Sequence, residues 1–191
     1  MRQIILASTS PRRRELLEKL GLPFIVVASD YVEDMAVALS PHKLAQFLAL
    51  GKATAVAKNY SDGIVIAADT FVLLAGKVLG KPYTAGEAHV MLKRISGSTL
   101  SIITGFAVID SRSKTVIKNA VATKIYMRQF SASEIQNYIK TGEPLDKAGA
   151  FAIQGIGAIL VKKIEGDFFN AVGLPLVSIA TALKKLGVSV L

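Results

Sequence analysis

The sequence lacks cysteine altogether, and it has no tryptophan and only two histidines among its 191 residues. The missing cysteine excludes disulfide scaffolds, thiolate zinc sites and cysteine nucleophiles, although it does not identify a redox compartment. The histidines, His42 and His89, both fall on expected helices. A two-histidine metal site or a histidine triad is therefore not expected.

Long hydrophobic runs are also missing, since no stretch reaches the roughly 18 uncharged apolar residues that a bilayer-spanning helix requires. The first ten residues are too short for a signal peptide, and three arginines follow at Arg12 to Arg14. We therefore expect a soluble, cytoplasmic protein without a membrane partner. Neither a G-x-x-x-x-G-K-[ST] phosphate loop nor a G-x-S-x-G elbow occurs, so Walker-type NTPases and serine hydrolases of that type are excluded.

The charge balance is basic, with 23 Lys and Arg against 14 Asp and Glu and a formal net charge of +9. Such a balance favours anionic partners: phosphate esters, nucleic acid or a membrane surface. Because the basic residues are spread along the chain, the pattern argues against a basic tail. Half of the residues are hydrophobic, which is ample for a packed interior, and the length suits one domain over residues 1–191 or two small lobes that share a core.

Apolar periodicity and turn residues predict alternating strands and helices in the first half and a β-hairpin in the second. The fold class is therefore α/β, with a mixed central sheet flanked by helices. Capping boxes at Thr84-x-x-Glu87 and Ser131-x-x-Glu134 predict two helix starts, and Ser-Pro at residues 10 and 40 predicts two more. We expect strands over 4–7, 24–28, 64–68, 100–110, 116–130 and 158–164, helices over 11–20, 41–59, 84–94, 131–140 and 175–186, and loops over 76–82 and 142–157, the second with a short strand. The third strand is expected to end at Asp69-Thr70, and residues 71–74 are expected to continue it.

A candidate anion site lies at the first of these helix starts. Ser8 precedes the helix, and Arg12 and Arg13 fall in its first turn, where free backbone N–H groups and the helix dipole favour phosphate oxygens. Two arginines in the first turn interact unfavourably with the positive end of the helix dipole, unless a bound anion neutralises them. The same residues are also typical of an ordinary serine cap followed by surface arginines.

Asp69 and Thr70 follow a buried apolar run, so we expect them at the carboxyl end of a strand, where open α/β sheets bind their ligands. A carboxylate there can hold a metal ion or take a proton from water. An acidic cluster at residues 30–34 contains Glu33, which could supply a second metal ligand or simply occupy an exposed loop. Lys52 and Lys81 adjoin glycines and are candidate phosphate contacts.

Taken in order, these motifs resemble the Maf family of nucleoside triphosphate pyrophosphatases along nearly the whole chain. The matching segments are Leu6-Ala7-Ser8-Thr9-Ser10-Pro11-Arg12-Arg13, Gly51-Lys52-Ala53, Ala68-Asp69-Thr70, Gly80-Lys81-Pro82, Ser96-Gly97, Thr104-Gly105, Glu134-Ile135, Gly142-Glu143-Pro144, Asp146-Lys147-Ala148-Gly149-Ala150, Ile153-Gln154-Gly155 and Asn170-x-x-Gly173-Leu174-Pro175.

The resemblance implies hydrolysis of a nucleoside triphosphate to the monophosphate and pyrophosphate, with a divalent metal ion (Mg²⁺, Mn²⁺ or Co²⁺) and a homodimer. It implies a long curved sheet and two lobes with a cleft, similar to inosine triphosphate pyrophosphatases. Asp69 matches the proton acceptor, and with Glu33 it is the candidate metal ligand. The positions tied to substrate choice are Arg13, Thr70 and Gln154; those matched elsewhere in the cleft are Ser8, Arg12, Glu33, Lys52 and Lys81.

The segment from Asp146 to Gly155 is similar to that of members that favour dTTP and UTP, with Phe151 in place of the usual Tyr. The amide of Gln154 is both donor and acceptor, so it can pair with the edge of uracil or thymine. Ser98 and Leu100 depart from the family, which usually has Arg and His there. Two other functions remain open: a basic nucleic-acid-binding protein, although no aromatic-rich basic strand supports it, and a nucleotide sensor that does not turn its ligand over.

Overall fold

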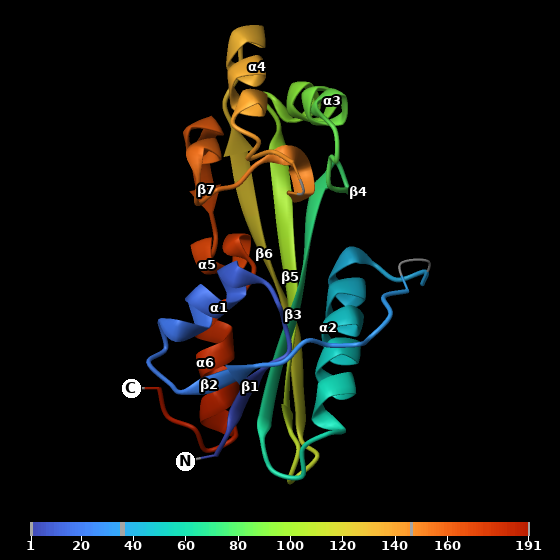
Figure 1. Cartoon of the computed structure of the whole chain (residues 1–191), viewed down its shortest axis with the longest axis vertical. Helices are drawn as coiled ribbons and strands as arrows, with labels where there is room; N and C mark the ends of the chain where they lie inside the picture. Colours follow the sequence, from blue (N-terminus) through green and yellow to red (C-terminus); the bar gives the residue numbers. More distant parts are fainter. Residues whose placement is uncertain (1, 35–36, 146, 191) are drawn as a thin grey trace. The chain divides into compact units, whose positions relative to one another are not determined.

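The computed structural model describes residues 2–34, 37–145 and 147–190. These residues form a mixed sheet with the strand order β2-β1-β3-β5-β6-β7, and β4 pairs with β3 (Figure 1). The expected α/β class with a central mixed sheet and flanking helices is confirmed. The strands are β1 (Ile4–Leu6), β2 (Phe24–Val26), β3 (Ile64–Leu74), β4 (Lys77–Leu79), β5 (Thr99–Asp110), β6 (Val116–Met127) and β7 (Val161–Glu165).

The described chain divides into two compact units. Unit 1 comprises residues 2–70, 103–121 and 169–190, and unit 2 comprises residues 71–102 and 122–168. Unit 1 contains the helices α1 (Pro11–Glu18), α2 (Pro41–Ala57) and α6 (Leu176–Lys185), and all of α5 (Phe168–Val172) except its first residue. Unit 2 contains α3 (Ala85–Ile95), α4 (Ala132–Lys140) and the short 3₁₀ helices η1 (Ala148–Ala150) and η2 (Ile156–Leu160).

In unit 1 the core forms on both faces of a largely parallel sheet. β1 pairs in parallel with both β2 and β3, and side chains alternate between the faces. One face packs against α2 through a cluster of small and branched side chains from the strands and the helix: Ile5, Ala7, Ala49, Ala53, Val56, Val65, Ala67, Ala107 and Ile109. The opposite face carries Ile4, Leu6, Ile64 and Ile66, all at most 1% exposed. Figure 1 shows α2 and α6 on opposite sides of these strands.

Helix starts follow the local sequence signals. At α3 and α4 the Thr84 and Ser131 side chains accept from the backbone of Glu87 and Glu134, whose carboxylates bond back, so both capping boxes are confirmed. At α1 and α2 the serines occupy the N-cap position but make no side-chain cap bond, so proline sets those starts.

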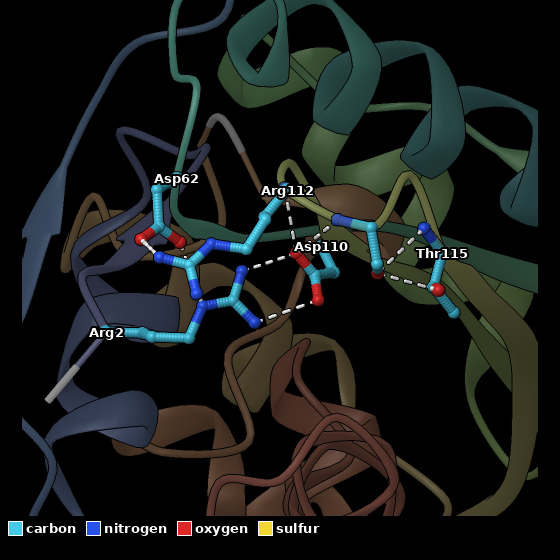
Figure 2. A network of polar contacts seen from close by, with 6 residues as sticks. Arg2, Asp62, Asp110, Arg112 and Thr115 are labelled. Atoms are coloured by element: carbon cyan, nitrogen blue, oxygen red, sulfur yellow. Dashed lines mark hydrogen bonds and ion pairs between the residues drawn. The ribbon is translucent and has the colours of Figure 1, made fainter.

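A polar network ties the beginning of the chain to the β5–β6 turn in unit 1 (Figure 2). Arg2 binds both carboxylate oxygens of Asp110, with one N–O distance of 2.8 Å, and its Nε donates to Asp62 at 3.0 Å. Asp62 also pairs with Arg112, while Asp110 accepts the backbone N–H of Arg112 at 2.9 Å. The pKa of Asp110 is held far below its usual value, mainly by the Arg2 hydrogen bond. This network therefore stabilises one end of the sheet through charge.

Two expected loops contain more structure than their glycines suggested. Residues 77–79 form β4, joined to β3 by Ala75 and Gly76, both with positive φ, in a two-residue hairpin turn. In the second loop, the described residues contain η1 and η2 but no strand, and β7 begins at Val161 instead of Ala158. The short helix α5, which is followed by Gly173 with φ +126°, was not expected. Within the described ranges, no helix is long and apolar enough to cross a bilayer.

Candidate active site

Asp69 lies inside β3 and not at its end, which corrects the expectation from the sequence. The strand continues to Leu74, but its parallel neighbour β1 stops at Leu6, the partner of Ile66. Asp69 therefore lies just beyond the carboxyl end of β1, where backbone and side chains from other elements can reach it. Because side chains alternate along a strand, Asp69 faces α2, as Ala67 does.

Lys52, on α2, meets two carboxylates at once. Its Nζ lies 2.5 Å from Oδ1 of Asp69 and 2.7 Å from Oε1 of Glu33. The Lys52 and Asp69 side chains are only 15% and 11% exposed, whereas Glu33 is 43% exposed. Two acids thus converge on one cation at a place where one of them is shielded from water and the other is accessible.

The segment that carries Glu33 is seated on α2 by two contacts. The ring of Tyr31 covers the backbone at Gly51, where an added Cβ would lie 2.3 Å from ring carbon Cζ. The hydroxyl of Ser29 donates to the Lys52 carbonyl oxygen at 3.3 Å and accepts from the Tyr31 N–H at 3.2 Å. Glycine at position 51 is therefore required for the ring to lie against the helix beside the Lys52–Glu33 pair.

Arg13 extends from α1 into a second polar group. Its Nε donates to the Gly173 carbonyl at 3.0 Å, its Nη2 to Oγ1 of Thr70 at 3.1 Å, and its Nη1 to Oγ of Ser8 at 3.4 Å. Ser8 is buried and also accepts from the backbone N–H of Ser10 at 3.3 Å. The predicted residues Ser8, Arg13 and Thr70 are therefore brought together, while Arg12 is exposed on the same helix.

Thr104 completes this group and was not among the predicted site residues. Its hydroxyl donates to the Asn170 carbonyl at 2.9 Å, so its oxygen must accept from Thr70, 3.0 Å away. Thr70 has then used its only proton, and it accepts from Arg13. Both Thr104 and Asn170 are fully buried. The sequence contained these residues within matched family segments, but only the fold reveals that they orient the Thr70 hydroxyl.

The surroundings of Arg13 shift the pKa of its guanidinium group. Burial lowers the pKa of the Arg13 guanidinium below its ordinary value; the charge of Asp69 opposes this, neighbouring Arg12 lowers the pKa further, and Glu33 raises it. Arginine stays protonated under all ordinary conditions. The buried Arg13 cation therefore lies in the field of the Asp69 and Glu33 carboxylates.

The remaining two predicted site residues, Lys81 and Gln154, belong to unit 2 and are both exposed. Lys81 follows β4, and the preceding Gly80 carbonyl accepts from the backbone N–H of Gly149 at 3.1 Å. Gln154 lies between η1 and η2. Asp146, which opens the matched segment, lies outside the described residues.

Two of the departures from the family, Ser98 and Leu100, have structural roles. The Ser98 hydroxyl donates to the Ile95 carbonyl at the end of α3, at 2.7 Å, and Leu100 is completely buried. A fully buried leucine cannot contact phosphate. The imidazole expected by resemblance at position 100 is thus replaced by a core side chain.

Asp69 and Glu33 fit a divalent metal ion by the chemistry of their oxygen atoms. Both reach the same cationic group, and two carboxylates completed by substrate phosphates are a usual ligand set for Mg²⁺. In the part of the chain that the structure describes, no group of three or more His, Cys, Asp or Glu side chains is placed to hold an ion.

Comparison with known proteins adds independent information. A family model described as "Maf-like protein" matches residues 3–186. The chain is 51% identical to the dTTP/UTP pyrophosphatase of Methanosarcina mazei over 191 residues, covering 100% of this chain and 97% of the relative. It is 50% identical to the dTTP/UTP pyrophosphatase of Alkaliphilus oremlandii, with 96% of each covered. Among solved structures, the Staphylococcus aureus Ham1 protein matches with a TM-score of 0.44 and 16% identity, covering 78% of this chain and 85% of that one.

Proposed function

The chain belongs to the Maf-like protein family, and on that premise we propose that it hydrolyses nucleoside triphosphates, with dTTP and UTP as substrates, to the monophosphate and pyrophosphate. Full-length relatives at about half identity bear the name dTTP/UTP pyrophosphatase, which supports this substrate class. The reaction breaks the anhydride bond between the α and β phosphates. We further propose that residues 1–191 act as one Maf-like catalytic domain in the cytoplasm, as a homodimer.

The observation that carries the proposal is the pair of carboxylates, Asp69 and Glu33, gathered on the Lys52 ammonium. A triphosphate brings up to four negative charges, so its site must supply cations, while an attacking water needs an acceptor for its proton. Acidic and basic groups within hydrogen-bond distance of one another meet both needs. Neither a serine nucleophile nor a thiol is required.

In the proposed reaction, Asp69 orients a water molecule and takes its proton as the water oxygen attacks the α phosphorus. Lys52 and Arg13 balance the charge of the phosphate oxygens, and we assign the same task to Arg12 and Lys81. Ser8, whose oxygen accepts from Arg13 and from the Ser10 N–H, donates its hydroxyl proton to an oxygen of the phosphate tail. Positioning and charge stabilisation therefore account for most of the rate, because the protein forms no covalent intermediate.

We propose a divalent metal ion, Mg²⁺, Mn²⁺ or Co²⁺, with Asp69 and Glu33 as its protein ligands. Such an ion draws charge from phosphate oxygens and so makes the phosphorus more electrophilic. Lys52 contacts both carboxylates and holds them near each other before the ion binds. Like charges at close range would otherwise repel.

We assign substrate selection to Arg13, Thr70 and Gln154. The Gln154 amide is suited to a pyrimidine edge that presents alternating donor and acceptor groups. Thr70 and Arg13 are locked together by the hydrogen bonds through Thr104 and Gly173, so they offer a rigid surface.

The direct test is pyrophosphate release from dTTP, UTP and the purine triphosphates with each of the three metals. Asp69→Asn should lower kcat at least about a hundredfold with little loss of nucleotide affinity, because the acceptor of the proton is removed. Asp30→Asn, at an exposed acid of the same loop as Glu33, is the matched control and should stay within twofold. Near-normal turnover in Asp69→Asn would refute the proton-acceptor role. Tight nucleotide binding by the native protein without hydrolysis would instead indicate a sensor.

A further inference from the structure

The segment that carries Gln154 is hydrogen-bonded to two side chains from earlier in unit 2, Glu143 and Tyr138. Oε1 of Glu143 accepts the backbone N–H of Gly157 and Oε2 accepts that of Ile156, both at 2.8 Å. The Tyr138 hydroxyl donates to Oε1 of Glu143 at 2.8 Å and accepts the N–H of Ala152 at 3.1 Å. These backbone attachments lie two residues before Gln154 and two and three residues after it.

Close packing reinforces these bonds. An added Cβ at Gly155 would lie 2.3 Å from Oε2 of Glu143, and one at Gly157 would lie 2.4 Å from the Tyr138 hydroxyl. The backbone on the carboxyl side of Gln154 therefore rests directly on this acid and this phenol. Only glycine at these two positions permits that approach.

Both groups hold the protonation state that the bonds require. Burial alone would raise the pKa of Glu143, but the N–H groups of Gly157 and Ile156, the Tyr138 hydroxyl and the charge of Lys147 together bring it below its usual value. Burial raises the pKa of Tyr138, and its bond to Glu143 raises it further. At neutral pH the carboxylate is therefore ionised and the phenol protonated, so Glu143 accepts all three donors.

We propose that Glu143 and Tyr138 are positioning residues for base selection: they fix the backbone on both sides of Gln154 and so present its exposed amide in one orientation. The inference rests on the proposed function, because it takes Gln154 as the group that reads the base. Its physical basis is preorganisation, since a loop already held in its bound conformation loses less entropy when the base arrives. Three hydrogen bonds to one carboxylate hold this segment, which contains no strand.

The same unit offers a matched control pair. The Tyr126 hydroxyl donates to Oε2 of Glu165 at 2.9 Å, between β6 and β7, and the other side chains that donate to this carboxylate are Lys124 and Lys163, outside residues 152–157. Tyr126→Phe and Glu165→Gln make the same chemical changes as Tyr138→Phe and Glu143→Gln. They therefore separate an effect on the Gln154 segment from the general cost of losing a tyrosine–glutamate bond.

The test measures equilibrium binding of two non-hydrolysable probes, dUTP and dATP with nitrogen bridging the α and β phosphates. We expect the dissociation constant of the dATP probe divided by that of the dUTP probe to fall about tenfold in Tyr138→Phe and in Glu143→Gln. In the two control variants this ratio should stay within twofold of the native value. Amide hydrogen exchange at Ile156 and Gly157 should accelerate in the first two variants only. Thermal unfolding of every variant checks that it is folded.

An unchanged binding ratio overturns the proposal, whether or not exchange accelerates. Equal weakening of both probes also overturns it, because a purely structural role predicts that result. A native protein that binds both probes equally well overturns it as well. Failure of the proposed function is a separate result: the native protein would release no pyrophosphate from dTTP or UTP, whereas the binding ratios do not depend on hydrolysis.

Discussion

A single methyl group at Gly105 should separate α2 from the sheet in unit 1. Gly105 lies on β5, and a Cβ built there would be 2.2 Å from the carbonyl carbon of Ala45, 2.3 Å from its oxygen and 2.5 Å from the amide nitrogen of Gln46. All three are backbone atoms of α2, so no side-chain rotation can make room. Gly105→Ala therefore requires the helix or the strand to move.

The size of the effect follows from the required movement. Restoring an ordinary carbon–carbon contact takes a displacement of roughly 1.3–1.8 Å, and a gap of about 0.5–1 Å already forfeits a quarter to a half of the dispersion energy at each contact it opens. The cluster between α2 and the sheet, which includes the fully buried Ala49 and Ala53, would lose these contacts. Overpacking alone costs about 1–3 kcal/mol, so we expect a total loss of about 3–5 kcal/mol. This is a large share of an ordinary stability of about 5–15 kcal/mol.

The measurement is chemical and thermal unfolding together with turnover. For a protein of this size, the expected loss lowers Tm by about 6–20 °C. Because α2 also carries Lys52, 2.5 Å from Asp69, the same displacement should reduce kcat by about a hundredfold. Gly86→Ala, in α3 with no heavy atom within 4 Å of the added methyl, is the control and should raise stability by about 0.5–1 kcal/mol. A destabilisation below about 1 kcal/mol in Gly105→Ala, with normal turnover, would refute the packing argument.

Three further predictions concern other groups. Gly51→Ala should displace the Tyr31 ring and lower kcat about tenfold. The higher helix propensity of alanine should offset about 1 kcal/mol of the packing cost. Unchanged turnover would contradict the conclusion that Tyr31 holds the Glu33 loop against α2. Asp110→Asn should cost about 1–3 kcal/mol at pH 7. Because the folded-state pKa of Asp110 is depressed, the difference from native protein should begin to shrink as the pH falls below roughly 4 and disappear only as the pH falls through that much lower pKa; a loss at about pH 2 equal to that at pH 7 would show that charge is not the cause. Gln154→Ala should reduce discrimination between pyrimidine and purine triphosphates about tenfold in kcat/KM, and an unchanged ratio would move base recognition elsewhere.

Local signals were sufficient where an element depends on its own residues. The capping boxes at Thr84 and Ser131 predicted both helix starts and the side-chain bonds that make them. The apolar run from Ile64 predicted a buried strand. These signals succeed because a cap or a strand face is decided within a few residues of itself.

The candidate site was only partly predictable, because it is assembled from residues that lie far apart in the sequence. Asp69 was expected at the end of a strand, but what ends beside it is β1, a neighbour more than 50 residues earlier in the sequence. Thr104 received no role, because its function depends on a carbonyl of the unforeseen helix α5. Hydrogen bonds between distant segments leave no spacing pattern in the chain.

Residue types and their order were enough to predict the family, the α/β class and the kinds of charge that the protein offers to a polyphosphate. The packing of distant segments was needed to show that Asp69 and Glu33 meet on one lysine, that Thr70 has a single hydrogen-bond orientation, and that the Gln154 segment rests on Glu143. Distances of about 3 Å between residues far apart in the chain arise from packing, and packing is a property of the whole fold.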